Sequence, residues 1–349
     1  MRIGEDGCRA QGVIARRART VTIQAVGRSW GTHVTAQVCD ANYASGPLSW
    51  AVSWEFAVSD WVLGVIGGSG LYEMDALQER RSVKVDTPWG DPSDEVVLGR
   101  IEGVRVAFLP RHARGHRLGP GEINARANVD ALKRVGCTDV VSISSVGSLR
   151  EDLAPGSFAL IAQYIDRTVA RPSSFFGSGV VAHVSMAEPT CPRLSALAAA
   201  AARRSGVEVT EGVTYLAMEG PQFSTRAESH LYRSWGCDVI GMTAMPEARL
   251  LREAELPYAN VGMVTDYDCW REASAHVQVS DVLEVMRSNA DAARRLVLEL
   301  ARSLPRPRAP SPIDTGLDQA IVTDAGHWDP TTLAKLDAIL GRRLGRAGT

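Results

Sequence analysis

The chain has 349 residues, of which 45% are hydrophobic and 22% charged, and its formal net charge is −2. This composition is typical of a globular protein that buries its own core in one large domain or two. Without a basic excess, binding to nucleic acid or to an anionic membrane surface is not expected. The six cysteines are scattered and form no C-x-x-C pair. Their spacing argues against a zinc site or a disulfide framework and favours a reducing, cytoplasmic location.

Residues 1–61 differ from everything that follows. They hold four of the eight tryptophans and sustain neither a helical nor a strand periodicity. An arginine pair near the start is not followed by the apolar run of a secretory signal. Glu55 and Asp60 interrupt the apolar stretch 47–67, so no membrane span is expected. We interpret residues 1–61 as an N-terminal extension that is either poorly ordered or the product of a mis-assigned start.

From Val62 onward, short apolar runs alternate with segments of helical spacing. The apolar runs predict strands at 62–66, 96–98, 104–109, 139–144, 158–164 and 207–218. The helical spacing predicts helices at 123–135, 191–205, 226–235 and 281–304. The stretch 238–268 combines both patterns as strand, turn, helix and strand. This alternation predicts an α/β domain with a largely parallel sheet in residues 62–304.

The pattern changes after residue 304. Four prolines between residues 305 and 312 predict a linker. Residues 330 to about 344 have the spacing of a short helix that docks on the body or on a neighbour. We therefore expect residues 305–349 to form a Pro-rich linker and a C-terminal helix.

Hydrogen-bond donors follow several of the predicted strands, and ligands of open α/β sheets bind beyond the carboxyl ends of the strands. Gly67-Gly-Ser-Gly70 ends the first strand, and its glycines let backbone amides approach an anion. The P-loop lysine is missing, however, and a tight turn would have the same composition. The other donors are Arg111, His112, Ser144, Ser145 and Thr243. Many donors with one or two cations and no nearby carboxylate predict a phosphate site that uses no metal.

Two carboxylates, Asp266 and Asp268, follow the last predicted strand and flank Tyr267. An extended segment would point both to the same side, whereas a turn would leave only one of them in a pocket. An ionised carboxylate accepts a hydrogen bond from an exocyclic amine, and a protonated one donates to a ring nitrogen. A metal site is not expected, because no histidine or third carboxylate follows at a suitable spacing. The alternative is a solvated loop.

Ten short motifs follow one another between Val62 and Leu304. They are Gly67-Gly-Ser-Gly-Leu71, Asp86-Thr-Pro-Trp-Gly90, Pro110-Arg-His-x-x-x-His116, Ile123-Asn-x-Arg-Ala-Asn128, Gly147-Ser-Leu-Arg150, Asp166-Arg-Thr168, Met186-Ala-Glu-Pro189, Glu219-Gly-Pro-Gln-Phe-Ser224, Met242-Thr243 and Thr265-Asp-Tyr-Asp-Cys-Trp270. In this order they resemble the methylthioadenosine phosphorylase branch of the purine nucleoside phosphorylases. The resemblance implies a single α/β domain with a mixed central β-sheet flanked by helices. It also implies a homotrimer that acts on a nucleoside and inorganic phosphate, without a cofactor.

The resemblance further implies phosphorolysis of S-methyl-5′-thioadenosine to adenine and 5-methylthioribose-1-phosphate. By position, phosphate would be held by Ser69, Arg111, His112, Ser144, Ser145 and Thr243. The nucleoside would be held by Phe223 and Ser224 at the base, Met242 at the ribose, His183 at the 5′ substituent, and the catalytic residues Asp266 and Asp268 at the purine. Asp266 would neutralise the purine at N7 while phosphate attacks C1′.

The two aspartates also predict which base is preferred. An ionised Asp offers only an acceptor, which suits the amino group of adenine, whereas a 6-oxo purine needs the donor of an Asn. Ser69 and Ser144 stand where eukaryotic members usually have Thr, and Thr243-Ala-Met245 resembles methylthioinosine-cleaving relatives. Methylthioinosine and purine nucleosides in general are therefore alternative substrates. A nucleoside hydrolase and a non-catalytic purine-binding protein of the same fold are further alternatives.

Overall fold

This computed structural model describes residues 60–68, 71, 73–271 and 279–345. The expectations for residues 1–59 lie outside these ranges. Trp61, which the sequence assigned to the N-terminal extension, is buried, and its Nε1 donates to the carbonyl oxygen of Pro305 at 2.7 Å. Trp61 therefore belongs to the folded body.

Within the described residues the chain forms nine strands in one sheet. The strands are β1 Val62–Gly67, β2 Gln78–Val83, β3 Val96–Ile101, β4 Val104–Pro110, β5 Asp139–Ser148, β6 Phe158–Asp166, β7 Val209–Ala217, β8 Val239–Gly241 and β9 Tyr258–Asp266. The α-helices are α1 Ala125–Arg134, α2 Pro192–Arg204, α3 Arg226–Ser234, α4 Ala244–Glu253, α5 Val279–Ser303 and α6 Pro330–Lys335. Every strand and helix expected from the sequence is present with shifted ends, and β2 is additional.

The sheet is mixed, with the strand order β2-β3-β4-β1-β5-β8-β7-β6-β9. β5 also pairs with β9, which closes the five strands from β5 to β9 into a ring. β1 pairs with β4 and β5 in parallel, whereas β2–β3, β3–β4, β5–β8 and β6–β9 are antiparallel. β5–β9, β6–β7 and β7–β8 are also parallel, so most pairings match the expected largely parallel sheet. The antiparallel pairs were not expected, and some follow from short turns such as Glu102-Gly103 between β3 and β4, which can only join antiparallel strands. The mixed sheet implied by the resemblance is confirmed.

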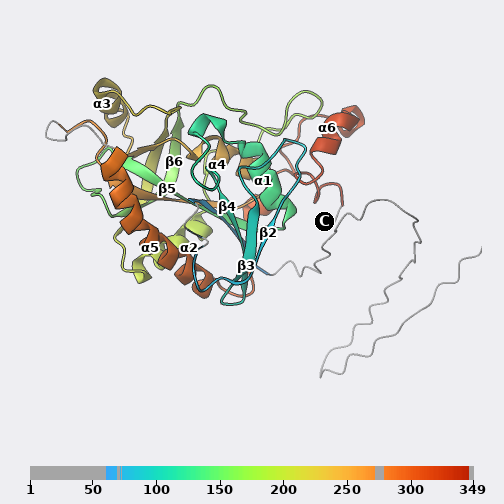
Figure 1. The fold of residues 1–349 in the computed structure, drawn as a ribbon. Helices are drawn as coiled ribbons and strands as arrows, with labels where there is room; N and C mark the ends of the chain where they lie inside the picture. Colours follow the sequence, from blue (N-terminus) through green and yellow to red (C-terminus); the bar gives the residue numbers. More distant parts are fainter. Residues whose placement is uncertain (1–59, 69–70, 72, 272–278, 346–349) are drawn as a thin grey trace, which may run out of the picture. The chain divides into compact units, whose positions relative to one another are not determined.

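Helices cover both faces of the sheet (Figure 1). α1 and α4 pack in one hydrophobic cluster with Val62 and Ile66 of β1, and α2 and α5 pack in a second cluster with Leu63 and Val65. The division follows from the two-residue period of a strand, which sends successive side chains to opposite faces. Each of these fully buried side chains contributes about 1.5–3 kcal/mol. β1 is therefore packed on both faces, which holds the strand in place up to its carboxyl end.

β5 continues to Ser148 instead of ending at Ser144 as predicted. Its pairing with β9 shifts register between Val146 and Gly147, because β9 has one extra residue, Thr265, at this point and bulges. A side chain at Gly147 would be crowded, because its Cβ would lie 3.0 Å from Oδ1 of Asp266 and 3.2 Å from Cγ2 of Ile240. Both Ser144 and Ser145 therefore lie inside β5, whereas the predicted strand ended at Ser144.

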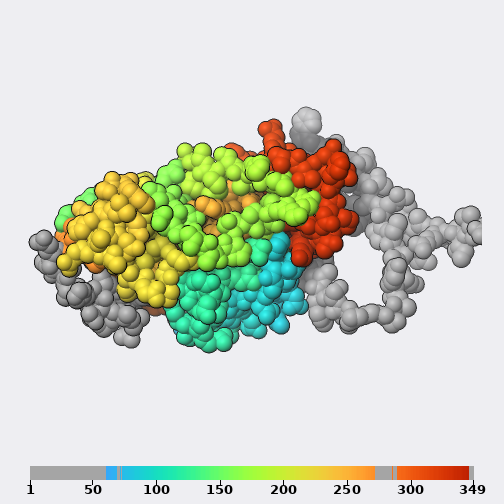
Figure 2. Space-filling model, turned by 90° about the horizontal axis from the view of Figure 1, so that it is seen from above, coloured from blue at the N-terminus to red at the C-terminus, as the bar shows by residue number. Residues whose placement is uncertain are grey.

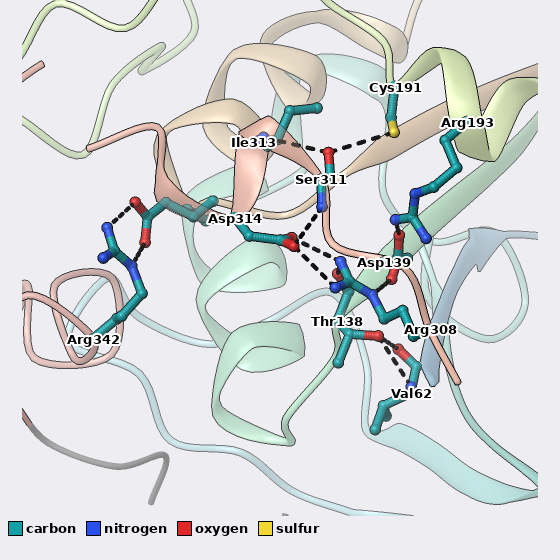
Figure 3. A network of polar contacts seen from close by, with 12 residues as sticks. Val62, Thr138, Asp139, Cys191, Arg193, Arg308, Ser311, Ile313, Asp314 and Arg342 are labelled. Carbon is teal, nitrogen blue, oxygen red and sulfur yellow. Dashed lines mark hydrogen bonds and ion pairs between the residues drawn. The ribbon is translucent and has the colours of Figure 1, made fainter. Parts of the chain in front are cut away.

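Residues 305–329 pack onto the body instead of forming the linker expected from their prolines (Figure 3). Residues 330–345 dock on the body, which was one of the two expected places. Arg308 forms ion pairs with Asp139 at the start of β5 and with Asp314, and Arg193 of α2 also binds Asp139. The side chain of Asp139 is fully buried, and the two arginines supply the opposite charge that a buried carboxylate needs. Apolar residues of the segment join the core, among them Ile313, Leu317, Leu336, Ile339 and Leu340.

The same segment also contacts the chain before α2, where the red and yellow-green atoms meet in Figure 2. Ala182 and Ile321 form an antiparallel bridge, and the His183 amide donates to the Ala320 carbonyl oxygen at 2.8 Å. α6 ends at Lys335 and is followed by turns, so the C-terminal helix is shorter than predicted. Among the described helices, none is both long and apolar enough to cross a membrane.

Candidate active site

A cavity of about 490 Å³ opens where β1, β4, β8 and β9 end, beside residues 143–147 of β5. The predicted site residues that line it are Arg111, His112, Ser144, Ser145, Phe223, Met242, Thr243, Asp266 and Asp268. Ser69 lies outside the described residues. Ser224 and His183 do not line the cavity. The tertiary structure therefore joins the predicted anion donors and the predicted carboxylates in one site.

Arg111 follows β4 and is 2% exposed. Its Nε and Nη2 donate to the two carboxylate oxygens of Glu247 at 3.0 and 3.2 Å, and Nη2 also donates to Oγ of Ser142 at 2.9 Å. Burial acts to lower the pKa of Arg111, but the charge and hydrogen bonds of Glu247 raise it above its ordinary value. The wall of the cavity therefore carries a fixed guanidinium, which is suited to a phosphate oxygen.

Ser144 and Ser145 bring two hydroxyl groups to the cavity. Both Oγ atoms are buried, and within the described part of the chain neither has a hydrogen-bond partner. Buried polar groups in folded proteins are nearly always paired, and an unpaired one costs about 1–3 kcal/mol. Two adjacent unpaired hydroxyls that line a cavity beside a cation are therefore suited to an anionic ligand.

Thr243 occupies the N-cap position of α4, but its side chain makes no capping hydrogen bond. Because Thr243 lines the cavity, its hydroxyl can serve an anion there. Arg171 stabilises the backbone around Thr243 by donating to the carbonyl oxygens of Met242 and Met245. Its Nε also donates to Glu219 at 3.1 Å. Met242 and Thr243 are therefore fixed in position before any ligand binds.

The sequence suggested that His112 acts as a ring donor, and the structure changes this. Its Nδ1 lies 2.8 Å from the carbonyl oxygen of Leu118, so Nδ1 must carry a proton, and the ring stacks on His116 at 4.3 Å. Burial lowers the pKa of His112 to about 4, and the neighbouring Arg111 and His116 act in the same direction. Near neutral pH the free ring is uncharged, and its Nε2 is an acceptor that suits a protonated phosphate oxygen.

Asp266 ends β9, and Asp268 follows in a left-handed backbone conformation with φ of 50°. The amide of Asp268 donates to Oδ1 of Asp266 at 2.8 Å, and the Thr265 hydroxyl donates to Oδ2 at 2.7 Å. The Ser229 hydroxyl of α3 donates to Oδ2 of Asp268 at 2.5 Å. The chain turns between the two aspartates, yet both line the cavity, so neither alternative drawn from the sequence describes them fully.

The two carboxyl groups keep a proton more readily than exposed ones. Burial raises the pKa of Asp266, and it raises the pKa of Asp268 to about 6, where the charge of Asp266 adds to the effect. Carboxyl groups with raised pKa values can donate a proton near neutral pH as well as accept a hydrogen bond. No group of three His, Cys, Asp or Glu side chains among the described residues could hold a metal ion.

The remaining predicted residues lie at the edge of the site or away from it. Phe223 lines the cavity and is 49% exposed, so one face of its ring is free to cover a ligand. The Ser224 hydroxyl contacts Sδ of Met218 at 3.7 Å, and its carbonyl oxygen accepts from Sγ of Cys269. His183 is exposed and lies in the stretch that pairs with the C-terminal segment.

Sequence reasoning missed four polar residues that hold the site: Ser142, Ser229, Glu247 and Thr265. Glu247 left a usable signal, since it lies four residues after Thr243 in a helix with an otherwise apolar face. The two serines leave no such signal, because a serine inside an apolar strand or helix has the same local pattern whether or not it touches a site.

The family model of the phosphorylase superfamily matches residues 62–302. Together with the mixed sheet and the cavity at its strand ends, this match shows that the chain belongs to the phosphorylase superfamily. The similar proteins described below are nucleoside phosphorylases of this superfamily. The S-methyl-5′-thioadenosine phosphorylase of Cereibacter sphaeroides is 58% identical over 285 residues, which cover 81% of this chain and 98% of that protein. The enzyme of the same name from Geobacter sulfurreducens is 50% identical over 281 residues, covering 80% and 98%.

Solved structures give the same result. A methylthioadenosine phosphorylase from an antarctic soil metagenomic library superimposes with a TM-score of 0.76 at 45% identity, covering 81% of this chain and 99% of that one. A mutant adenosine/methylthioadenosine phosphorylase from Schistosoma mansoni, in complex with methylthioadenosine, gives 0.66 at 37% identity, covering 70% and 91%. The match to the Cereibacter sphaeroides enzyme spans 285 residues, which is longer than the segment 62–304, so the similarity extends beyond that segment.

Proposed function

We propose that this chain catalyses the phosphorolysis of S-methyl-5′-thioadenosine, which yields adenine and 5-methylthioribose-1-phosphate. The observation that carries the proposal is one cavity that combines a buried guanidinium and two unpaired hydroxyls with two carboxyl groups of raised pKa, one half-buried and one buried. The names of the bacterial relatives, at 50–58% identity over nearly their whole length, support it.

On the phosphate side, Arg111, the two serines and Thr243 bind and orient the anion, and Ser69 is a further candidate. A phosphate oxygen attacks C1′ of the ribose as the bond from C1′ to N9 breaks, and the electron pair of that bond goes to the purine. The bound anion stabilises the positive charge that develops on the ribose. Donors fixed in advance are effective here, because they need no reorganisation when the charge appears.

On the base side, we assign the proton transfer to Asp266, which donates to N7 of the departing purine. Its two oxygens are held by Thr265 and by the amide of Asp268, so the carboxyl group has one orientation. Asp268 in its ionised form accepts from the exocyclic amine, and this favours adenine over a 6-oxo purine. Phe223 covers the base and Met242 lies against the ribose. Asp268 thus orients Asp266 through its backbone and serves the base through its side chain.

Replacing Ser229 with Ala is expected to move the acidic limb of the pH profile of kcat/KM upward by about one pH unit. The Ser229 hydroxyl favours the ionised form of Asp268, so its loss raises the pKa of Asp268 above its present value of about 6. Activity that needs ionised Asp268 is then lost at a higher pH as the pH falls. Ser234→Ala on the exposed side of α3 is the matched control, and an identical profile for Ser229→Ala would contradict the assignment.

We propose that the active assembly is a homotrimer. His183 is exposed and does not line the cavity of its own chain, so it can serve the 5′ substituent only in the cavity of another copy.

We further propose that phosphate is the co-substrate, that no cofactor takes part, and that the protein works in the cytoplasm. The free thiols of Cys137, Cys191, Cys237 and Cys269 support a reducing compartment.

A phosphate-dependent assay tests the proposed function. Methylthioadenosine, methylthioinosine, adenosine and inosine are compared at saturating phosphate, and base release is measured with and without phosphate. We expect methylthioadenosine to have the highest kcat/KM and turnover to require phosphate. Base release without phosphate would favour a hydrolase, and a higher kcat/KM for methylthioinosine would move the substrate assignment to that nucleoside. No turnover of any of the four would favour a non-catalytic purine-binding protein.

A further inference from the structure

A cluster of buried polar side chains lies behind the guanidinium of Arg111 and does not touch the cavity. Glu247 is 5% exposed, and Ser142 and Tyr258 are also buried. None of the three is among the residues that line the cavity, whereas Arg111 is. Glu247 and Ser142 are linked to the cavity by their hydrogen bonds with Arg111.

The contacts within the cluster form a chain. Glu247 accepts from Nε and Nη2 of Arg111 with its two oxygens, at 3.0 and 3.2 Å. The hydroxyl of Tyr258 donates to Oε1 of Glu247 at 2.8 Å, so the carboxylate is itself held in place. Two of the three nitrogens of the guanidinium are thus committed to the cluster, and rotation of the planar group would break both bonds at once.

Glu247 has two opposing effects on an anion in the cavity. Its negative charge offsets the positive charge of Arg111 and weakens the long-range attraction for phosphate. Its bidentate contact fixes the plane of the guanidinium, so the remaining N–H groups are already aimed when phosphate arrives. Without a partner, a buried guanidinium would turn toward any accessible acceptor or water, and its fixed direction would be lost.

We propose that Glu247 is a positioning residue for phosphate, which acts by holding Arg111 and is itself held by Tyr258. The proposal rests on the proposed function, because it assumes that phosphate binds beside Arg111. The alternative is that Glu247 only stabilises the fold by pairing a buried cation. A purely structural carboxylate would leave the KM for phosphate and the KM for the nucleoside unchanged in the folded variant, or would change both alike.

The test measures both KM values in the full-length variants Glu247→Gln and Tyr258→Phe. For Glu247→Gln we expect the KM for phosphate to rise about tenfold or more, because a hydrogen-bonded charge pair is lost. The KM for methylthioadenosine at saturating phosphate should stay within about twofold. Tyr258→Phe removes a single hydroxyl and should raise the KM for phosphate by about three- to tenfold.

Glu253→Gln is the matched control. Glu253 is a second buried glutamate of α4, 6% exposed, and its oxygens accept from the Ser174 hydroxyl and the Phe175 amide rather than from Arg111. Its replacement can change the melting temperature but should leave the KM for phosphate unchanged. Should Glu247→Gln fail to fold, Tyr258→Phe decides the question alone, because removing its hydroxyl leaves the ring and the charge pair in place.

An unchanged KM for phosphate in the folded variants would overturn the proposal, and so would an equal rise in both KM values. If the wild-type protein shows no turnover, the proposed function is wrong, but the positioning role of Glu247 can still be tested. Calorimetric titration with inorganic phosphate then tests the positioning role directly. Equal phosphate affinity of the wild-type protein and Glu247→Gln, or no phosphate binding at all, would overturn it, and about tenfold weaker binding by the variant would support it.

Discussion

Replacing Asp266 with Asn is expected to lower kcat/KM for methylthioadenosine by about 10²- to 10³-fold. The carboxyl group is half-buried, desolvation raises its pKa, and Thr265 and the Asp268 amide donate to its two oxygens. An amide cannot give a proton to N7, and its NH₂ group would face one of these two donors. The loss therefore falls on the step in which negative charge develops on the purine, and steady-state kinetics at saturating phosphate measures it.

The same substitution should also reduce the preference for adenine. N7 and the C6 substituent lie on the same edge of a purine, so a side chain at position 266 that faces N7 also lies near the C6 substituent. An Asn there offers a donor to a 6-oxo purine, so kcat/KM for inosine-type substrates should fall less than for adenosine-type substrates. Asp91→Asn, at an exposed carboxylate before β3, is the control and should match the wild-type protein. An unchanged ratio of the two substrate types would count against a role of Asp266 in base choice.

Replacing both Ser144 and Ser145 with Ala is expected to raise the KM for phosphate by about 100-fold or more, because each hydroxyl loses a hydrogen bond to an anion. The stability of the phosphate-free protein should not fall. Both Oγ atoms are buried without a partner in the described structure, so removing them relieves unpaired polar groups. Thermal unfolding with and without phosphate measures both effects, since bound phosphate raises the melting temperature of the wild-type protein.

Ser195→Ala provides the control for this pair. The Oγ of Ser195 is also buried without a partner in the described structure, but it lies on α2 and does not line the cavity. The control should therefore match the double variant in phosphate-free stability while keeping the wild-type KM for phosphate. A wild-type response of the double variant to phosphate would show that the two hydroxyls do not meet the anion.

Local patterns in the sequence were sufficient to predict most of the helices and strands. β1 appears as a continuous apolar run because it is buried on both faces, and α1 and α2 appear through helical spacing that ends before a glycine. β2 was missed because its residues are charged and almost all exposed, so an edge strand of this kind has no apolar period. The packing of residues 305–329 was missed because their prolines predicted a linker, whereas the expected docking of residues 330–344 on the body is confirmed by the burial of Leu336, Ile339 and Leu340.

By itself, the sequence determined which side chains can bind an anion and a base, and that most of them follow strands. Such groups can be recognised locally, because Arg, Ser and Asp carry their chemistry wherever they lie. Only the tertiary structure decided that Arg111 and Asp266 share one cavity, that the two serines of β5 line the same cavity, and that His112 is neutral near pH 7. It also decided that Glu247 holds Arg111. Burial, register and long-range pairing set these properties, and they depend on residues distant in the chain.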